Sequence, residues 1–315
     1  MITSGLMICS FYLKKRFSRD DDNLYNLNEQ FVTRDEEHKH DNVLDMLNSF
    51  CQENFEFSDD EKNMKMFSVD SGTIQISDEE TYRALSFSIR SGAYGLESNI
   101  TDRNTKKIKY QRTEDDADIK NFKFLAFVPK DVNNTSVSKG IMIFQTLGTY
   151  GVKTITLNYL KRFFAERDLT LETRSVSIRA FIEKLVEYGR MYKITLVKNR
   201  VSPDSIDNIF INSGREERSY IKPQLKPAWF EKFLQLIESK SEIYEIEDVC
   251  YDDIKIQFKL GDNYRTVGLR HIDKFSVVED IPDSIYKNGK YEEDALTKYM
   301  LDTAIEYKEK MIFSV

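Results

Sequence analysis

Residues 140–154, Gly-Ile-Met-Ile-Phe-Gln-Thr-Leu-Gly-Thr-Tyr-Gly-Val-Lys-Thr, contain the pattern that decides the fold. The apolar run Ile141–Phe144 predicts a buried central strand, and the two glycines that follow, three residues apart, predict a tight turn. Beyond the turn, apolar side chains recur at helical spacing, so a helix should begin near Lys153; they are Leu157, Leu160, Phe163 and Phe164. The stretch therefore predicts a strand, a glycine turn and a helix in succession.

The glycine turn is the sharpest chemical signal in the chain. Backbone N–H groups exposed at such a turn can hold an anion, which makes Gly148, Gly151 and Thr154 candidate anion-binding residues. A nucleotide-binding P-loop needs four residues between its first glycine and its Gly-Lys-Thr end, whereas this turn has two and places Val152 before Lys153. The sequence therefore predicts no nucleotide hydrolysis. KH domains share the Gly-x-x-Gly spacing, but their clamp lies between two helices, and a strand-to-helix turn that needs glycine dihedrals explains the pattern more simply.

The other segments predict an α+β fold built on an antiparallel meander. A helix is expected over Asp41–Gln52, where apolar residues share one face. Short β-like runs then follow one another from Met64 to Lys130. Three polar stretches are interpreted as the turns between these strands, namely Ser71-Gly72, Ser91-Gly92 and Asp102–Asn104.

The chain is expected to divide near residue 225. The larger core region, 1–225, holds the meander, the glycine turn and a basic middle segment with a second helix at Ser177–Tyr188. The smaller acidic region, 226–315, begins with a helix at Trp229–Ile237 and continues with a small meander, in which Gly261-Asp262-Asn263 forms a hairpin turn. A helix over Tyr291–Met311 closes the chain.

Composition places the chain among globular proteins. It has 315 residues, of which 40% are hydrophobic and 31% are charged. The three cysteines are far apart and odd in number, which favours a reducing compartment over a disulfide framework; they are Cys9, Cys51 and Cys250. No run approaches the apolar length of a membrane helix, and Lys14, Lys15 and Arg16 follow the first apolar run instead of preceding it, which is the wrong order for a secretory signal. A cytoplasmic protein without membrane insertion is expected.

The net charge of −7 conceals a basic middle segment. Residues 139–200 contain twelve Lys or Arg against five Asp or Glu, whereas residues 241–315 contain ten against seventeen. A local excess of cations is typical of a polyanion-binding surface, with neighbouring tyrosines able to stack on bases. The nucleic-acid-binding residues predicted from this excess are Lys153, Lys161, Arg162, Arg179, Lys184 and Arg190. The sequence does not distinguish DNA from RNA, and a solvated helix face or a match to an acidic surface would show the same charges.

Signals for metal or cofactor chemistry are weak. His38 and His40 lie two apart, which does not place them on one helix face, and no Cys/His cluster has zinc spacing, so neither a metal site nor a cofactor is predicted. Asp252-Asp253 precedes a strand that carries lysines, as in metal-dependent nucleases, but Gln257 occupies the place of the further acidic residue. A strand with alternating solvent-facing side chains explains these residues fully. A nuclease therefore remains the alternative, and the sequence leaves the question of an enzyme open.

The segment Gly140–Thr154 resembles a stretch of uncharacterised bacterial proteins found in accessory and phage-defence gene neighbourhoods. Together with a preceding strand that ends near Val128-Pro129-Lys130, the resemblance covers about a tenth of the chain, and it brings no catalytic residues with it. It implies an antiviral context. Taken with the basic middle, it predicts a non-catalytic nucleic-acid-binding component of a defence system. The alternatives are the metal-dependent nuclease and an interaction subunit that docks an acidic protein partner or a second copy of the chain.

Overall fold

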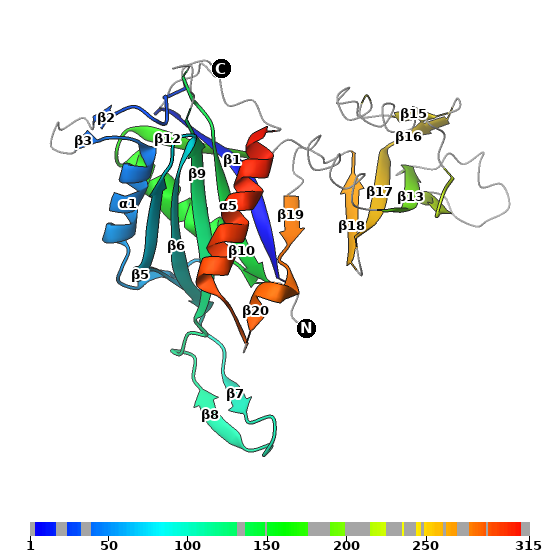
Figure 1. Ribbon diagram of the computed structural model, residues 1–315. Coiled ribbons are helices and arrows are strands. Elements are labelled where there is room, and N and C mark those ends of the chain that lie inside the picture. Colours follow the sequence, from blue (N-terminus) through cyan, green and yellow to red (C-terminus); the bar gives the residue numbers. More distant parts are fainter. Residues whose placement is uncertain are drawn as a thin grey trace. The chain divides into compact units, whose positions relative to one another are not determined.

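The computed structural model describes residues 4–16, 24–32, 39–130, 136–148, 150–175, 190–198, 215–224, 235, 244–246, 249–260, 263–269, 277–287 and 289–309 (Figure 1). The chain groups into two compact units, 1–176 together with 276–315, and 177–275. Each unit is described by itself below. The predicted division at residues 225 and 226 falls outside the described residues and stays a prediction.

Unit 1 is built on a nine-stranded antiparallel sheet. Its main path runs β12-β1-β10-β9-β6-β5-β4, while β11 pairs with β10 and β19 pairs with β1. The strand bounds are β1 Ser4–Lys15, β4 Ser58–Asp60, β5 Lys65–Asp78, β6 Tyr82–Ala93, β9 Lys120–Pro129, β10 Gly140–Leu147, β11 Tyr150–Gly151, β12 Leu169–Ser175 and β19 Val277–Asp280. From β4 to β10 the strands follow chain order, apart from an excursion between β6 and β9. The predicted antiparallel meander and α+β fold are confirmed at this level.

The predicted central strand lies in the middle of this sheet. β10 pairs with β9 on one side and β1 on the other, and Ile141–Phe144 are fully buried. After Leu147 the chain turns at Gly148, whose φ of +59° is a conformation that glycine adopts without strain. Helix α2 then begins at Lys153, as predicted, and ends at Ala165.

Helices cover both faces of the sheet. On one face, Tyr159 of α2 stacks on Phe67 of β5 with ring centroids 4.3 Å apart, and Phe163 of α2 meets Phe50 of α1 (Val43–Glu53) at 5.4 Å. On the other face, α5 (Glu293–Glu309) crosses β9 and β10, as Figure 1 shows. Because both faces are covered, β9 and β10 are buried along most of their length, which explains their continuous apolar sequence.

Two of the three predicted turns are wrong. Ser71-Gly72 lies inside the single long strand β5, at a bulge between Asp70 and Gln75. Ser91-Gly92 lies inside β6, where a Cβ on Gly92 would come within 2.0 Å of the Asp118 carbonyl oxygen. Glycine at these positions therefore serves a bulge and a close approach of two backbones instead of chain reversal. The third, Asp102–Asn104, is a turn as predicted.

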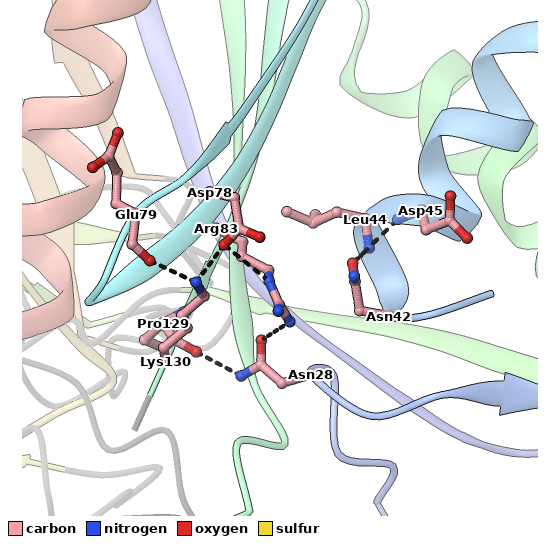
Figure 2. Close-up of polar contacts among 9 residues, drawn as sticks. All are labelled: Asn28, Asn42, Leu44, Asp45, Asp78, Glu79, Arg83, Pro129 and Lys130. Atoms are coloured by element: carbon pink, nitrogen blue, oxygen red, sulfur yellow. Dashed lines mark hydrogen bonds and ion pairs between the residues drawn. The ribbon is translucent and has the colours of Figure 1, made fainter. Parts of the chain in front are cut away.

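The short elements of unit 1 lie around the sheet and include β7 Ser98–Thr101 and β8 Ile108–Arg112. The others are β2 Phe31–Val32, β3 Lys39–His40, a 3-10 turn at Asp283–Ile285, β20 Tyr286–Lys287 and β21 Lys290–Tyr291. Asn42 caps α1, because its side-chain oxygen accepts from the N–H groups of Leu44 and Asp45 at 2.9 and 3.2 Å (Figure 2).

Two cations, Arg83 and Lys130, make ion pairs and hydrogen bonds at the end of the sheet where β5 is followed by β6. Figure 2 shows Arg83 and Lys130 converging on the Asp78 carboxylate. Lys130 also donates to the Glu79 carbonyl at 2.6 Å, and Arg83 reaches the side chain of Asn28 at 3.4 Å. The hydrogen bond from Lys130 and the charge of Arg83 lower the pKa of Asp78. These cations close a turn and are not free to bind a ligand.

Unit 2 contains a four-stranded antiparallel sheet in the order β14-β13-β17-β18 and a separate pair, β15-β16. The bounds are β13 Arg190–Lys198, β14 Glu216–Ile221, β15 Tyr244–Ile246, β16 Val249–Tyr251, β17 Asp253–Leu260 and β18 Asn263–Gly268. β17 and β18 pair as the predicted hairpin. The predicted helix Ser177–Tyr188, and all but one residue of the one at Trp229–Ile237, lie outside the described residues.

The closing helix, expected in the acidic C-terminal region, packs on the sheet of unit 1 as α5. Over the described part of the chain, the structure contains no helix that is long and apolar enough to cross a membrane.

Candidate nucleic-acid interface

Helix α2 presents part of the predicted basic surface. Lys161 and Arg162 are exposed on its outer side, while Arg162 also lies 3.9 Å from the exposed Glu166 carboxylate one turn later. Thr154 is exposed in the first turn. Lys153 is half-buried. Burial raises the pKa of the Cys9 thiol to about 11, and the charge of Lys153 opposes part of this rise. Two of the predicted cations are therefore exposed on this helix, and one of them, Arg162, also contacts Glu166 and the Tyr159 ring.

Residues on both sides of the glycine turn pair with each other as short antiparallel strands. Thr146 and Leu147 of β10 face Gly151 and Tyr150 of β11 in an antiparallel register. The exposed Tyr150 ring lies 4.5 Å from the Lys120 ammonium, at the start of β9. Anion binding at Gly148, Gly151 and Thr154 stays a prediction, but the turn has a structural role in linking β10 to α2.

The structure does not place the other predicted cations beside α2. Arg179 and Lys184 lie outside the described residues. Arg190 is exposed at the start of β13, in unit 2. In the same unit, Ile254, Ile256 and Phe258 of β17 are buried while the side chains between them are more exposed, as the alternating pattern predicts for a structural strand.

A second group of cations, which was not predicted from the sequence, lies on a projecting hairpin. Figure 1 shows β7 and β8 extending beyond the end of the sheet where β6 ends and β9 begins. Among the described strands, β7 pairs only with β8, and nearly every residue from 98 to 112 is exposed. The hairpin carries five cations, which are Arg103, Lys106, Lys107, Lys109 and Arg112.

The three cations at the tip of the hairpin have no partner among the residues that the structure describes. Within the described chain, the side chains of Arg103, Lys106 and Lys107 make no ion pair or hydrogen bond, and all three are exposed. They differ in this respect from Arg83 and Lys130 at the opposite end of the sheet. Unpaired cations gathered on a projecting element are available to a negatively charged ligand.

Asp102 orders the tip. Its carboxylate accepts from the N–H groups of Asn104 and Thr105 at 2.9 and 2.8 Å and pairs with Lys109 at 2.7 Å. Its backbone carbonyl accepts from the Lys106 N–H at 2.9 Å. The hydrogen bond from Lys109 and those from the two backbone N–H groups lower the pKa of Asp102 to about 2. The Asp102 carboxylate therefore stabilises the loop through these contacts.

Arg112 fixes the base of the hairpin. Its guanidinium donates to the Asp116 carbonyl at 2.7 Å and to the Ala93 carbonyl at the end of β6. The Gly95 N–H donates to the Glu114 carbonyl at 2.7 Å, which links the segment that enters the hairpin to the segment that leaves it. The hairpin is therefore held at both its base and its tip.

Charge is separated along this excursion. Residues 102–112 contain five Lys or Arg and one acidic residue, a local +4, whereas residues 113–118 contain four Asp or Glu and no cation, a local −4. Arg103, Lys106 and Lys107 lie at the tip, whereas Arg112 and the acidic residues that follow it lie at the base. A polyanion is therefore attracted to the tip and repelled from the base.

The tip and the α2 cations form separate groups. β6, β9 and β10 place the hairpin and the first turn of α2 at the same end of the sheet. Lys161 lies eight residues after Lys153, which is about 12 Å further along the helix at 1.5 Å per residue. The predicted binding residues include the α2 group but not the hairpin, although a charge count over residues 102–112 would have indicated it.

No protein-family model matches the chain, and no curated protein is similar to it in sequence.

Proposed function

We propose that the protein is a non-catalytic nucleic-acid-binding component and that the tip of the β7–β8 hairpin is its main contact with the phosphate backbone. The observation that carries the proposal is the set of three exposed, unpaired cations, Arg103, Lys106 and Lys107, on a hairpin that is fixed at both ends. Lysine and arginine side chains that neutralise phosphates supply most of the non-specific affinity for nucleic acid.

The acidic character of the rest of the chain supports a localised contact. With a net charge of −7 the chain as a whole repels a polyanion, and the local −4 at residues 113–118 does so directly beside the hairpin. Lys161 and Arg162 on α2 are the second candidate contact. We expect them to contribute less, because Glu166 lies near Arg162 and two cations neutralise fewer phosphates than three.

The antiviral context of the proposal rests on the resemblance of residues 140–154 to proteins of phage-defence neighbourhoods. Two rival functions remain. A metal-dependent nuclease would use clustered carboxylates such as Asp252 and Asp253, and an interaction subunit would dock its cations on an acidic protein. Cleavage of nucleic acid that depends on added Mg²⁺ would favour the first, and the absence of nucleic-acid binding would favour the second.

The test compares two charge-matched triple variants and one double variant by fluorescence anisotropy with DNA and RNA at low salt. The tip variant is Arg103→Gln, Lys106→Asn, Lys107→Gln, where asparagine is chosen because Lys106 has a φ of +59°. The control variant is Lys287→Gln, Lys290→Gln, Lys298→Gln, which removes three exposed cations elsewhere in unit 1. The third is Lys161→Gln, Arg162→Gln.

We expect the tip variant to lose about tenfold or more in affinity, the control variant to bind like the wild type, and the α2 variant to fall between them. Equal losses in the tip and control variants would show that only net charge matters and would contradict a localised contact. Absence of binding by the wild type would refute the proposal.

A further inference from the structure

The shape of the hairpin restricts which nucleic acid it can engage. Its strands are four and five residues long, which at about 3.3 Å per residue gives a ribbon about 13–17 Å long before the tip loop is added. The major groove of B-form DNA is about 12 Å wide and about 8.5 Å deep, and it admits a two-stranded ribbon. The hairpin is therefore long enough to reach the floor of that groove while the acidic base stays outside.

The rigidity of the hairpin favours insertion. Asp102 holds the tip loop through two backbone N–H groups and Lys109, and Arg112 holds the base through two backbone carbonyls. A preorganised element loses little conformational freedom on binding, so more of its contact energy appears as affinity. A flexible basic tail would follow the phosphates of any nucleic acid, whereas a fixed ribbon fits only a groove of matching width.

Exposed side chains with apolar surface lie among the cations, and one of them, Tyr110, also hydrogen-bonds with the Asp116 side chain at the base. Ile100 and Tyr110 face each other directly across the ladder and are 54% and 50% exposed, and Ile108 is 60% exposed. In the major groove, apolar side chains can contact the thymine methyl group while flanking cations reach the phosphates on either side. The ribbon carries both kinds of side chain.

We infer that the β7–β8 hairpin inserts into the major groove of double-stranded B-form DNA, so that duplex DNA is the ligand of this surface. The inference rests on the proposed nucleic-acid-binding function and specifies its ligand. The major groove of A-form RNA is deep and narrow and does not admit such an element. Single-stranded nucleic acid offers no groove, so it would contact the tip cations alone.

The experiment has two parts, both on the full chain. The first measures the affinity for duplex DNA, single-stranded DNA and duplex RNA of equal length at one salt concentration. The second probes the complex with dimethyl sulfate, which methylates guanine N7 in the major groove and adenine N3 in the minor groove. The tip and control triple variants are carried through both parts.

We expect duplex DNA to bind about tenfold or more tightly than the other two ligands. Guanine N7 should be protected in the wild-type and control complexes and not with the tip variant, while adenine N3 should stay reactive. Ile100→Ser with Ile108→Ser should weaken duplex binding and leave single-strand binding unchanged, because both side chains are exposed and the Tyr110–Asp116 hydrogen bond is kept.

Two results would overturn the inference while the proposed function stands. One is equal affinity for all three ligands, and the other is protection confined to adenine N3, which would place the hairpin in the minor groove. Absence of binding to every ligand would overturn both, and it would leave docking on an acidic protein as the function of the tip.

Discussion

Asp102 shows how a single carboxylate can set the conformation of a loop. Its pKa of about 2 lies below the ordinary aspartate value of 3.8, because Lys109 and the N–H groups of Asn104 and Thr105 bind the charged form. A carboxylate whose folded pKa is depressed stabilises the folded loop above its unfolded pKa and loses that contribution as the pH falls through the folded value. The order of the tip should therefore decrease between about pH 4 and pH 2.

Amide hydrogen exchange checks this prediction. The Asn104 and Thr105 amides should lose protection as the pH falls through this window, after correction for the intrinsic exchange rate, while amides of the buried strand β9 keep theirs. In Asp102→Ala the two tip amides should be unprotected already at neutral pH. Protection that is unchanged in Asp102→Ala would show that another contact orders the loop.

Among the elements, α5 and β9 bury a lysine between them. Lys123 of β9 is 2% exposed, and its ammonium has no hydrogen-bond partner within the described residues. Burial lowers its pKa, while the carboxylates of Glu293, Asp294 and Asp70 oppose the shift. An unsatisfied buried polar group costs about 1–3 kcal/mol, so Lys123→Met should raise the free energy of unfolding by an amount of that order.

The pH dependence of stability distinguishes this explanation from better packing alone. Because the folded pKa of Lys123 lies below the ordinary value of 10.5, the unfolded chain binds more protons between the two values. Wild-type stability should therefore gain from this group as the pH rises toward 10.5, and Lys123→Met should lose that gain. Denaturant unfolding from pH 7 to 10 measures both; a variant less stable than the wild type, or an unchanged slope with pH, would contradict the account.

The elements also show what periodicity can and cannot predict. The apolar run Ile141–Phe144 identified the central strand because helices on both faces leave no polar position in it. Glycine was a poorer guide, since Gly72 and Gly92 permit a bulge and a close backbone approach inside strands. Such approaches depend on distant segments, here Asp118, and have no local signature.

The projection of the hairpin could not be predicted either. Ile100, Ile108 and Tyr110 give β7 and β8 the composition of half-buried strands, although they pack on no core. Its charge was hidden because the +4 of residues 102–112 is cancelled by the −4 of residues 113–118 that follow. The predicted surface on α2 was found because its excess is spread over a longer window, but only Lys161 and Arg162 proved exposed on that helix.

At the scale of the whole molecule, an acidic chain carries a basic tip on a hairpin that is held away from its sheet. This arrangement limits the number of phosphates that can be neutralised, so the dependence of binding on salt should be shallow and should come largely from three side chains. The logarithm of the binding constant falls with the logarithm of the salt concentration, with a slope of about −0.9 per phosphate neutralised on B-form DNA.

The measurement that tests this account most directly is that slope for duplex DNA, in the wild type, the tip variant and the control variant. If Arg103, Lys106 and Lys107 each contact a phosphate, the slope should become shallower by about three units in the tip variant and stay unchanged in the control. An equal slope in the tip variant and the wild type, at measurable affinity, would contradict the assignment of the hairpin as the nucleic-acid contact.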